Sequence, residues 1–501
     1  MSDNLFELIA AHAPAPERTF LRTPDGRVLS YGGMIEAAGR YASALAALGV
    51  RPGDRVAVQV EKSPEAILLY LGCLRAGAVY LPLNTAYTLA ELEYFIGDAE
   101  PRVVVCSPDR REGLAALAER LGVAHVETLG DDGRTGGLVD KAGAASPDFA
   151  AVPRQAGDLA AILYTSGTTG RSKGAMLTHA NLASNALVLK DYWRFTDQDV
   201  LIHALPIFHT HGLFVATNIV LLAGAEMIFL PKFDAGEILR LLPEATSLMG
   251  VPTFYVRLLQ DPRLDRALCA KMRLFVSGSA PLLAETHREF ARRTGHAILE
   301  RYGMTETNMN TSNPYDGERI AGTVGFPLPG VALRVTDPET GAPLPDGEIG
   351  MIEVKGPNVF AGYWRMPEKT AAEFRADGFF ITGDLGLVDA RGYVSIVGRG
   401  KDLIISGGFN VYPKEVETEI DALPGVEESA VFGTPHPDFG EGVTAAVVLK
   451  PGAALTEAEA IAALRDRLAA YKLPKRVFFV PHLPRNAMGK VQKAMLRETY
   501  G

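Results

Sequence analysis

The amino-acid sequence predicts an α/β protein. We expect a large N-terminal domain, built of α/β subdomains and a β-rich subdomain, followed by a small α+β C-terminal domain. Strand and helix patterns alternate in the first third of the chain. Short β-rich runs separated by turns occupy residues 323–397, and a new alternation begins after residue 402. The 501 residues, 47% of them apolar, are enough for more than one hydrophobic core. We predict domains at residues 1–400 and 401–501.

The first hundred residues alternate regularly between helix and strand. Apolar residues from Met34 to Leu48 recur at helical spacing after Ser30, a typical N-cap residue. Thr88 and Glu91 have the spacing of a capping box. The same alternation predicts strands at 56–60, 79–83 and 103–105, and helices that begin at Ser63-Pro64 and at Thr88. Repeated strand-helix-strand units of this size indicate a parallel sheet covered by helices.

The patterns after residue 130 are less regular. Residues 131–155, rich in Gly, Ala, Pro and Asp, are expected to form a surface connection. Turns such as Pro345-Asp346-Gly347 indicate antiparallel strands within 323–397. In the last hundred residues we expect helices that begin at Pro413 and Thr456, and strands at 430–432, 445–449 and 477–480.

The charge balance and the cysteines limit the partners and the compartment. Lys and Arg number 50 against 59 Asp and Glu, so the net charge of −9 gives no overall basic footprint for nucleic acid or an anionic membrane. The three cysteines, Cys73, Cys106 and Cys269, are too far apart for zinc-site spacing and fit a reducing compartment. Neither a secretory signal nor a membrane span is recognised. We expect a cytoplasmic protein without a nucleic-acid or membrane partner.

The most informative segment is Tyr164-Thr165-Ser166-Gly167-Thr168-Thr169-Gly170-Arg171-Ser172-Lys173-Gly174. Its glycines allow backbone N–H groups to approach an anion, its hydroxyls add donors, and Lys173 adds a positive charge, so a polyphosphate is the expected ligand. It is not a Walker loop, because its flanks predict strand-loop-strand rather than strand-loop-helix. Taken alone, the segment also fits a flexible linker.

Further motifs follow this loop in order along the chain. They are Leu205-Pro206-Ile207-Phe208-His209, Tyr302-Gly303-Met304-Thr305-Glu306, Thr382-Gly383-Asp384, Gly398-Arg399-Gly400-Lys401-Asp402 and Pro484-Arg485-Asn486-Ala487-Met488-Gly489-Lys490. As an ordered set they resemble the adenylate-forming superfamily of acyl-CoA synthetases, peptide-synthetase adenylation domains and luciferases. The resemblance implies the adenylate-forming enzyme fold and a two-step reaction. A carboxylate and ATP form acyl-AMP and pyrophosphate, and a thiol, usually of coenzyme A, then displaces AMP.

The resemblance also implies roles for single residues in the nucleotide site. The carboxylate of Asp384 suits the two ribose hydroxyls, and Glu306 is a hard oxygen ligand suited to Mg²⁺. Thr305 is expected to hold the α-phosphate, and Tyr302 to offer its face to adenine. The residues assigned to ATP or AMP are Thr165, Ser166, Gly167, Thr168, Thr169, Gly170, Lys173, Ser279, Ala280, Pro281, Glu300, Arg301, Tyr302, Gly303, Met304, Thr305, Asp384, Arg399 and Lys490.

Lys490 is the residue expected to act on the reacting atoms, as a cation between the substrate carboxylate and the α-phosphate. Thr305, Glu306 and His209 complete the expected catalytic set. In the superfamily the small domain rotates after adenylation about a hinge, which matches Lys401 here. The segment that then lines the pantetheine tunnel matches Ser406, Gly407, Gly408 and Phe409. A turn at a domain boundary would explain these glycines equally well.

Two arginines point to the acid that is activated. Arg301 precedes the Tyr-Gly-Met-Thr-Glu motif, and Arg257 follows a segment that borders the acyl site in the superfamily. Burying two unpaired cations would cost several kcal/mol each, so we expect the acid to carry a second carboxylate. Alternatively, an arginine could pair with a protein carboxylate such as Glu300. The surrounding sequence resembles the malonyl-CoA synthetases, which implies malonate, and also methylmalonate, as the acid. The acid-binding residues would be His209, Thr210, Arg257, Ser279, Arg301 and Met309.

Other functions remain open on the sequence. A monocarboxylate or aryl acyl-CoA synthetase is the nearest alternative, and a stand-alone amino-acid adenylation domain is a weaker one. A luciferase-like oxygenase shares the same motifs. A non-catalytic nucleotide-binding relative would be expected to lack Lys490, Glu306 or Asp384, which are all present. In the superfamily the catalytic lysine is a target of acylation, so a lysine acetyltransferase and a deacetylase are expected partners of Lys490.

Overall fold

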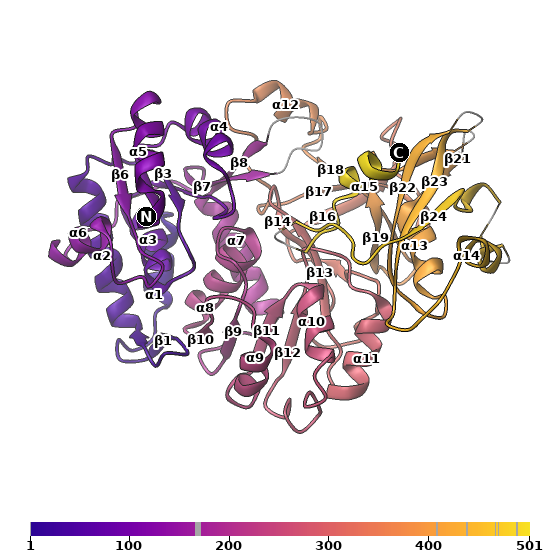
Figure 1. Ribbon diagram of the computed structural model, residues 1–501. Coiled ribbons are helices and arrows are strands. Elements are labelled where there is room, and N and C mark those ends of the chain that lie inside the picture. The colour runs from indigo at the N-terminus through magenta and orange to yellow at the C-terminus, as the bar shows by residue number, and fades with distance from the viewer. Residues whose placement is uncertain are drawn as a thin grey trace.

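The computed structural model describes residues 2–165, 172–406, 409–436, 439–465, 467–468, 470–486 and 489–501. Within these ranges the strands form four sheets, of six, nine, four and five strands. Figure 1 shows the six-stranded sheet on the left, the nine-stranded sheet in the centre and the C-terminal part, orange to yellow, on the right. The predicted α/β fold with a large N-terminal and a small C-terminal part is confirmed.

The six-stranded sheet has the order β6-β5-β3-β4-β7-β8. Its neighbouring strands are parallel except for β7 and β8, which are antiparallel, so the predicted strand-loop-strand context of the phosphate loop is confirmed. Residues 166–171 of that loop lie outside the described ranges. The strands are β3 (Arg55–Gln59), β4 (Val79–Pro82), β5 (Val103–Cys106), β6 (His125–Thr128), β7 (Leu159–Thr165) and β8 (Lys173–Thr178). The helices nearby are α1 (Leu5–His12), α2 (Tyr31–Ala47), α3 (Pro64–Arg75), α4 (Leu89–Ala99), η1 (Pro108–Arg110), α5 (Arg111–Arg120) and α6 (Gly137–Ala144).

The predicted helix starts are confirmed at the level of single hydrogen bonds. The Oγ of Ser30 accepts from the backbone N–H of Gly33 at 3.1 Å. Thr88 and Glu91 form both hydrogen bonds of a capping box at the start of α4. Such caps satisfy backbone donors that the first helical turn leaves unpaired. Their signals are local in the sequence, and for this reason they can be predicted from it.

The expectation of a plain surface connection at 131–155 is wrong in part. Helix α6 lies inside it, and its residues Leu138 and Ala142 are buried against the main core. The Oγ1 of Thr128 accepts from the N–H of Gly137 at 2.8 Å and so satisfies one donor of the first turn. Tertiary packing on α2 overrides the weak helical propensity of this Gly-rich segment.

The nine-stranded sheet forms the centre of the molecule, with the order β15-β14-β13-β12-β11-β9-β10-β1-β2. The strands from β1 to β13 in this order are parallel, and β2, β14 and β15 are antiparallel to their neighbours. The strands are β1 (Thr19–Arg22), β2 (Val28–Ser30), β9 (Val200–His203), β10 (Glu226–Phe229), β11 (Ser247–Gly250), β12 (Leu274–Ser277), β13 (Leu299–Met304), β14 (Asn308–Ser312) and β15 (Phe326–Pro327). The associated helices are α7 (His179–Tyr192), the π-helix η2 (His211–Thr217), α8 (Asn218–Ala223), α9 (Ala235–Leu241), η3 (Leu242–Glu244), α10 (Pro252–Leu259) and α11 (Ala284–Thr294).

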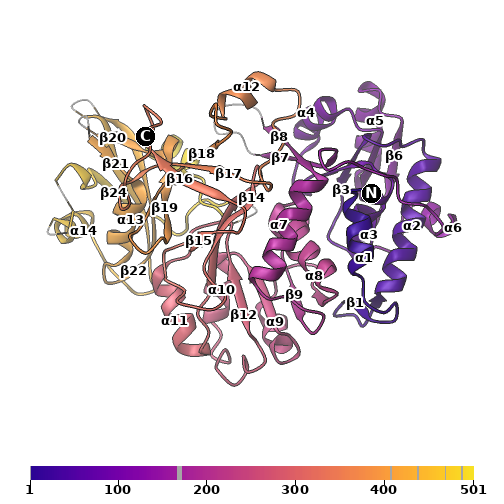
Figure 2. The ribbon, with the colours of Figure 1, turned by 180° about the vertical axis from the view of Figure 1, so that it is seen from behind.

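A layer of helices joins the two large sheets. Helix α7 contacts β7, β8 and β14, α1 and α8 pack against it, and α3 packs against α1. Figures 1 and 2 show this layer between the sheets. The ring of Tyr70 on α3 lies 5.3 Å from that of Tyr80 on β4 and 5.9 Å from that of Phe214 in η2. One continuous core therefore fixes the π-helix relative to both sheets.

The two smaller sheets follow in the second half of the chain. The four-stranded sheet is antiparallel, as predicted for 323–397, and α12 (Pro367–Ala372) lies in a loop between two of its strands. Its strands are β16 (Ala332–Thr336), β17 (Gly350–Lys355), β18 (Phe380–Val388) and β19 (Val394–Arg399). The chain then passes through η4 (Gly400–Asp402) into the five-stranded sheet of the C-terminal part. That part contains β20 (Ile404–Ser406), β21 (Phe409–Val411), α13 (Pro413–Asp421), β22 (Val426–His436), β23 (Gly440–Leu449), α14 (Glu457–Leu464), η5 (Ala470–Lys472), β24 (Arg476–Phe479) and α15 (Lys493–Tyr500).

The C-terminal part contacts α10 and α11 of the large part. A Cβ built on Gly489 would lie 3.4 Å from Cγ2 of Thr253, so the loop before Lys490 lies against the start of α10. The Nζ of Lys450 lies 3.5 Å from Oε1 of Glu285 on α11. Among the helices that the structure describes, none has the length and apolar character of a membrane span. The cytoplasmic location stays a prediction.

Candidate functional site

The candidate site residues gather at the carboxyl edge of the nine-stranded sheet. Strand β9 ends at His203 before the segment 209–211, β11 ends before α10, and β12 ends before Gly278. Strand β13 itself carries Glu300, Arg301 and Tyr302. The carboxyl ends of parallel strands meet at one edge of a sheet, where α/β proteins generally bind their ligands.

Asp384 forms the centre of one polar cluster. It lies opposite Arg399 in the pairing of β18 with β19, and its Oδ1 is 2.7 Å from Nε of Arg399. The hydroxyl of Tyr302 donates to Oδ2 of Asp384 at 2.6 Å. Burial, followed by the charge of Asp384, raises the pKa of Tyr302 well above its usual value. Each carboxylate oxygen keeps one lone pair, so Asp384 can still accept from two hydroxyls of a ligand.

Glu306 belongs to a second cluster, which also contains two residues that the sequence motifs do not mark, Tyr363 and Glu373. The hydroxyl of Tyr363 lies 3.0 Å from Oε1 of Glu306 and 2.6 Å from Oε2 of Glu373. The Nζ of Lys173 lies 3.1 Å from Oε1 of Glu373 and 4.1 Å above the ring of Tyr363. Burial raises the pKa of Glu306. Lys173, the cation of the phosphate loop, is therefore held beside Glu306 by a protein carboxylate.

The fit of a magnesium ion can be judged from these donors. Within the described residues no group of three or more His, Cys, Asp or Glu side chains could hold a metal. Magnesium is usually held by one or two carboxylates together with substrate phosphates and water, rather than by a cage of protein ligands. The single buried carboxylate of Glu306 beside the base of the phosphate loop fits that pattern.

Arg301 is a buried guanidinium with free donors. Its residue is 4% exposed, and its Nε and Nη2 have no hydrogen-bond partner among the described residues. Desolvation lowers the pKa of Arg301 to about 9, so that it remains charged at neutral pH. A Cβ on Gly278 would lie 2.3 Å from Cζ of Arg301, so only glycine allows the guanidinium to lie against this backbone.

Polar side chains at the start of η2, one of which feels the charge of Arg301, are also unsatisfied. Oγ1 of Thr210 and the Nε2 atoms of His209 and His211 are buried without a partner in the described structure. Nδ1 of His211 lies 3.4 Å from Oγ of Ser279, whose φ of +72° is in the left-handed region. Desolvation lowers the pKa of His209 to about 4, and desolvation and then the charge of Arg301 lower that of His211. Buried donors and acceptors without partners are costly, so three such residues in succession, with His211 beside Ser279 and within the field of Arg301, indicate a site for a polar ligand.

Glu300 does not pair with Arg301. Neighbouring residues on a strand point to opposite faces, and Oε1 of Glu300 accepts from the N–H of Gly322 at 3.3 Å. Burial raises the pKa of Glu300 to about 8, which favours its neutral form. The alternative in which Glu300 neutralises Arg301 is therefore not realised.

Arg257 differs from the expected picture of two buried cations. It is exposed on α10, with its guanidinium 5.7 Å from the centre of the Phe233 ring. An exposed guanidinium is solvated and needs no ligand charge. Met309, in contrast, is buried, with only 2% of its surface exposed. Its Cε would lie 2.7 Å from a Cβ built on Gly303. Arg301 and Met309 are thus buried. Arg257 is exposed, so the expectation that it is buried is wrong, and its contact with the acid stays a prediction.

Lys490 approaches the Asp384 cluster from the C-terminal part. The side chain keeps exposed surface, yet desolvation, followed by the charge of Arg399, lowers its pKa, and Asp384 opposes this effect. Lys401 experiences the same kind of shift from desolvation. The structure therefore brings Lys490, Arg399 and Asp384 together.

The remaining predicted residues are placed as follows. Thr165 ends β7, with its Oγ1 3.5 Å from the carbonyl oxygen of Lys173. Met304 and Thr305 are half-buried at the end of β13, and Ala280 is half-buried while Pro281 is exposed. Ser406 is buried in β20, and Phe409 begins β21. Ser166, Gly167, Thr168, Thr169, Gly170, Gly407 and Gly408 lie outside the described ranges.

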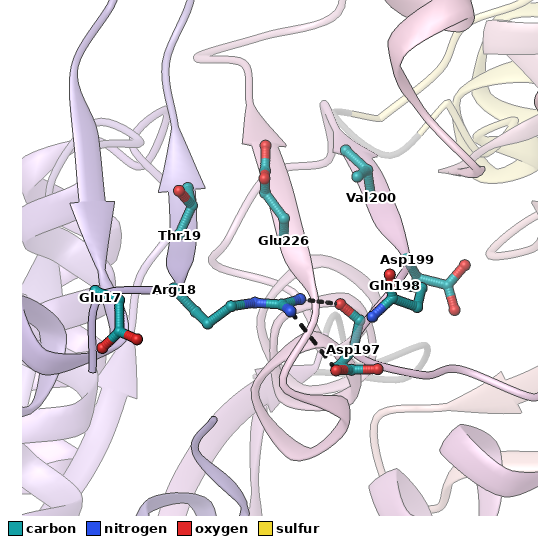
Figure 3. A pocket seen from close by; sticks show the side chains of 8 residues that line it. All are labelled: Glu17, Arg18, Thr19, Asp197, Gln198, Asp199, Val200 and Glu226. Atoms are coloured by element: carbon teal, nitrogen blue, oxygen red, sulfur yellow. Dashed lines mark hydrogen bonds and ion pairs between the residues drawn. The ribbon is translucent and has the colours of Figure 1, made fainter. Parts of the chain in front are cut away.

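A surface hollow of about 340 Å³ lies at the opposite, amino-terminal edge of the nine-stranded sheet (Figure 3). Thr19, Val200 and Glu226, the first residues of β1, β9 and β10, line it. Three of its carboxylates pair with arginines: Asp197 with Arg18, Glu226 with Arg22 and Asp199 with Arg273. None of the predicted site residues lies in this hollow.

Known proteins resemble this chain along its whole length. Residues 9–364 match the family described as AMP-binding enzyme, and residues 415–490 match the AMP-binding enzyme C-terminal domain. ATP-bound MatB from Rhodopseudomonas palustris is 66% identical, with a TM-score of 0.98 over 100% of this chain and 99% of that one. The apo form of the same protein superposes with a TM-score of 0.88.

Two curated relatives differ in the acid that their names give. A feruloyl-CoA synthase from an Amycolatopsis species is 38% identical over 97% of both chains. A malonate–CoA ligase from Arabidopsis thaliana is 34% identical over 95% of this chain and 85% of the relative. Identity to these relatives does not separate an aromatic acid from a dicarboxylate, so the acid has to be argued from the pocket.

Proposed function

Because this chain belongs to the family of AMP-binding enzymes, we propose that it joins malonate, and also methylmalonate, to coenzyme A through an acyl-AMP intermediate. ATP and coenzyme A are the other substrates. The observation that carries the proposal is Arg301, a buried guanidinium whose Nε and Nη2 have no partner in the described structure. A buried unpaired cation is costly, and a second carboxylate on the acid would supply both the missing charge and the missing acceptors.

The walls around Arg301 support a small, polar acid. Thr210 and His211 offer unsatisfied polar atoms, and Ser279 lies beside His211. Met309, buried on β14 next to Gly303, would close one side with its apolar methyl group. Planar guanidinium groups suit carboxylates because two parallel N–H donors match the two oxygens. A feruloyl group would place an aromatic ring against these polar atoms and leave them unpaired. For this reason we favour a dicarboxylate over an aryl monocarboxylate.

In the first half-reaction, an oxygen of the substrate carboxylate attacks the α-phosphorus of ATP, and the bond to pyrophosphate breaks. Asp384 accepts from the ribose hydroxyls, with Arg399 and Tyr302 holding its carboxylate in place. Thr305 orients the α-phosphate. Lys490 would stabilise negative charge that develops between the carboxylate and the α-phosphate, and its closeness to Arg399 and Asp384 supports this role. When bound, Mg²⁺ would neutralise phosphate charge, and Glu306 is the residue that would hold it.

In the second half-reaction, the thiol sulfur of coenzyme A attacks the acyl carbon, and the bond to the AMP oxygen breaks. Lys490 occupies the approach to the acyl carbon during adenylation, so the C-terminal part has to move away first. We assign the hinge to Lys401, which lies in η4 between β19 and β20. Ser406, Gly407, Gly408 and Phe409 would then line the path of the pantetheine chain.

A substrate panel tests the proposed function. Acid-dependent pyrophosphate release and thioester formation should be measured with malonate, methylmalonate, succinate, acetate and benzoate. We expect malonate to give the highest kcat/KM, with methylmalonate within about tenfold, because a pocket discriminates one methyl group by ~1 to 3 kcal/mol. Higher kcat/KM for acetate or benzoate would contradict the proposal and would favour the monocarboxylate alternative.

Acetylation of Lys490 is expected to switch adenylation off. Acetylation removes the charge of the lysine, and with it the electrostatic contribution at the reacting atoms. We propose a lysine acetyltransferase and a deacetylase as partners of this residue. Site-specific incorporation of acetyllysine at position 490 should lower pyrophosphate release by roughly 10²-fold, and enzymatic deacetylation should restore it. Full activity of the acetylated protein would refute this regulation.

A further inference from the structure

Lys62 connects the six-stranded sheet to the nine-stranded sheet. It follows β3, and its Nζ lies 2.9 Å from Nδ1 of His203 and 2.8 Å from the carbonyl oxygen of His203, the last residue of β9. The same Nζ lies 4.3 Å above the ring of Phe229 on β10. Within the described part of the chain, no ion pair joins Lys62 to a carboxylate.

The surroundings of Lys62 suit its charged form. An ammonium group has three N–H donors and no acceptor, and here it faces an imidazole nitrogen, a carbonyl oxygen and an aromatic face. A neutral amine would need a donor for its lone pair, and the contacts described here provide none. Burial lowers the pKa of Lys62, but each neighbour stabilises the ammonium.

The hydrogen bonds of His203 fix its tautomer. Its Nε2 lies 2.8 Å from the carbonyl oxygen of Gly212, which can only accept, so Nε2 carries the proton. Nδ1 then keeps a lone pair and accepts from Lys62. The hydroxyl of Thr217 donates to the same carbonyl oxygen at 2.9 Å. Lys62, His203 and Gly212 thus form a chain of hydrogen bonds with one direction.

These hydrogen bonds end at the first turn of the π-helix η2. Such helices are rare and often occur at functional sites. A Cβ on Gly212 would lie 2.1 Å from the carbonyl oxygen of Pro206, so η2 begins in direct contact with the backbone of the preceding segment. Thr210 and His211, which carry unsatisfied polar atoms, directly precede Gly212, and His211 feels the charge of Arg301. The position of Gly212 therefore sets the position of this wall of the acid pocket.

We propose that Lys62 and His203 are positioning residues for the acid: they hold the first turn of η2 and thereby keep Thr210 and His211 in place against Arg301. The inference rests on the proposed function for the assignment of this wall to the acid. Without Lys62, Nδ1 and the carbonyl oxygen of His203 each lose a donor. The imidazole is then held only by its Nε2–H, so the ring can turn, which weakens the hydrogen bond to Gly212.

Steady-state kinetics with the full-length enzyme tests this role. Lys62→Met and His203→Leu should each raise the KM for the acid by about tenfold, because small displacements of binding groups have large effects. The KM for ATP should stay within about twofold. Among the described residues, Asp384, Arg399 and Tyr302 of the proposed ribose site make no hydrogen bond to Lys62, His203 or Gly212. Lys141→Met is the matched control, since Lys141 pairs with Glu127 at the far edge of the six-stranded sheet.

Two further variants separate positioning from a general loss of structure. His203→Gln keeps an N–H for Gly212 and an oxygen for Lys62, so the KM for the acid should remain within about threefold of the wild-type value. Lys62→Met combined with His203→Leu should be no worse than His203→Leu alone, because the two residues act in series. Three results would each overturn the proposal. The KM for ATP could rise as much as the KM for the acid, or His203→Gln could be as impaired as His203→Leu. In the double variant, the effects of the two single substitutions on the KM for the acid could multiply. The acid used is the one that the wild type prefers. If the wild type prefers an acid other than malonate, the proposed function is contradicted, but the variants measured with that acid still test the role of Lys62 and His203.

Discussion

Replacing Arg301 with methionine should lower kcat/KM for malonate by roughly 10²- to 10³-fold, because truncating one partner of a buried charged pair costs ~2 to 5 kcal/mol. Activity with acetate should change by less than about fivefold, since a monocarboxylate offers no second carboxylate to this guanidinium. The free energy of unfolding of the ligand-free protein should not fall, because methionine replaces a buried charge that has no carboxylate partner. Kinetics with both acids and chemical denaturation measure these effects.

Three further arginine variants make this result specific. Arg301→Lys keeps the charge but loses the two-pronged donor geometry, so it should fall between the wild type and Arg301→Met. Arg257→Ala should cost less than Arg301→Met, because Arg257 is exposed and its charge is already solvated. Arg240→Ala, which removes an exposed arginine paired with Glu237, should match the wild type. An equal loss of malonate and acetate activity in Arg301→Met would mean that Arg301 has only a structural role.

Lys490→Ala should abolish acyl-AMP formation while sparing the second half-reaction. Loss of a charge that stabilises the transition state should lower the rate of adenylation by about 10²- to 10³-fold. Conversion of supplied malonyl-AMP to the thioester should stay within about threefold, because Lys490 has to leave the acyl site before the thiol enters. Pyrophosphate release measures the first half-reaction, and AMP release from synthetic malonyl-AMP and coenzyme A measures the second.

A conservative substitution controls for local disruption at this position. Lys490→Arg keeps a positive charge on a longer side chain, and the backbone N–H of residue 490 still donates to Oδ1 of Asn486. This variant should retain part of the adenylation activity. If Lys490→Ala impaired both half-reactions equally, the assignment of Lys490 to the first step would be wrong.

The parts of the fold that could be predicted from the sequence have local causes. Ser30, Thr88 and Thr456 mark helix starts because their side chains accept from backbone N–H groups only three residues away. The antiparallel strands at 332–399 follow from turn residues between short β-rich runs. The predicted strands 430–432 and 445–449 lie within β22 and β23 but are too short, since β22 covers Val426–His436 and β23 covers Gly440–Leu449. A twisted hairpin extends beyond its apolar centre, where pairing with β23 compensates for weak propensity.

The parts that could not be predicted depend on contacts between distant segments. The pairing of Lys173 with Glu373 joins residues 200 positions apart, and no motif marks Glu373. The contact of Lys62 with His203 spans 141 positions and depends on how the two large sheets pack. The different environments of Arg257 and Arg301 also arise in three dimensions, because one lies on the solvent side of a helix and the other beneath Gly278. The order of the motifs along the chain indicates the adenylation chemistry, but only the packing of the folded chain decides that Arg301 is buried and Arg257 exposed.

The most direct test of the central claim compares malonate with its monomethyl ester in the wild-type enzyme. The ester keeps the activated carboxylate and is close to malonate in length, but it lacks the second negative charge. We predict that kcat/KM for malonate exceeds that for the ester by at least about 10²-fold, since a buried guanidinium left without its carboxylate forfeits ~2 to 5 kcal/mol. The ratio should fall to within about fivefold in Arg301→Met. Equal kcat/KM values for the two acids in the wild type would contradict the account.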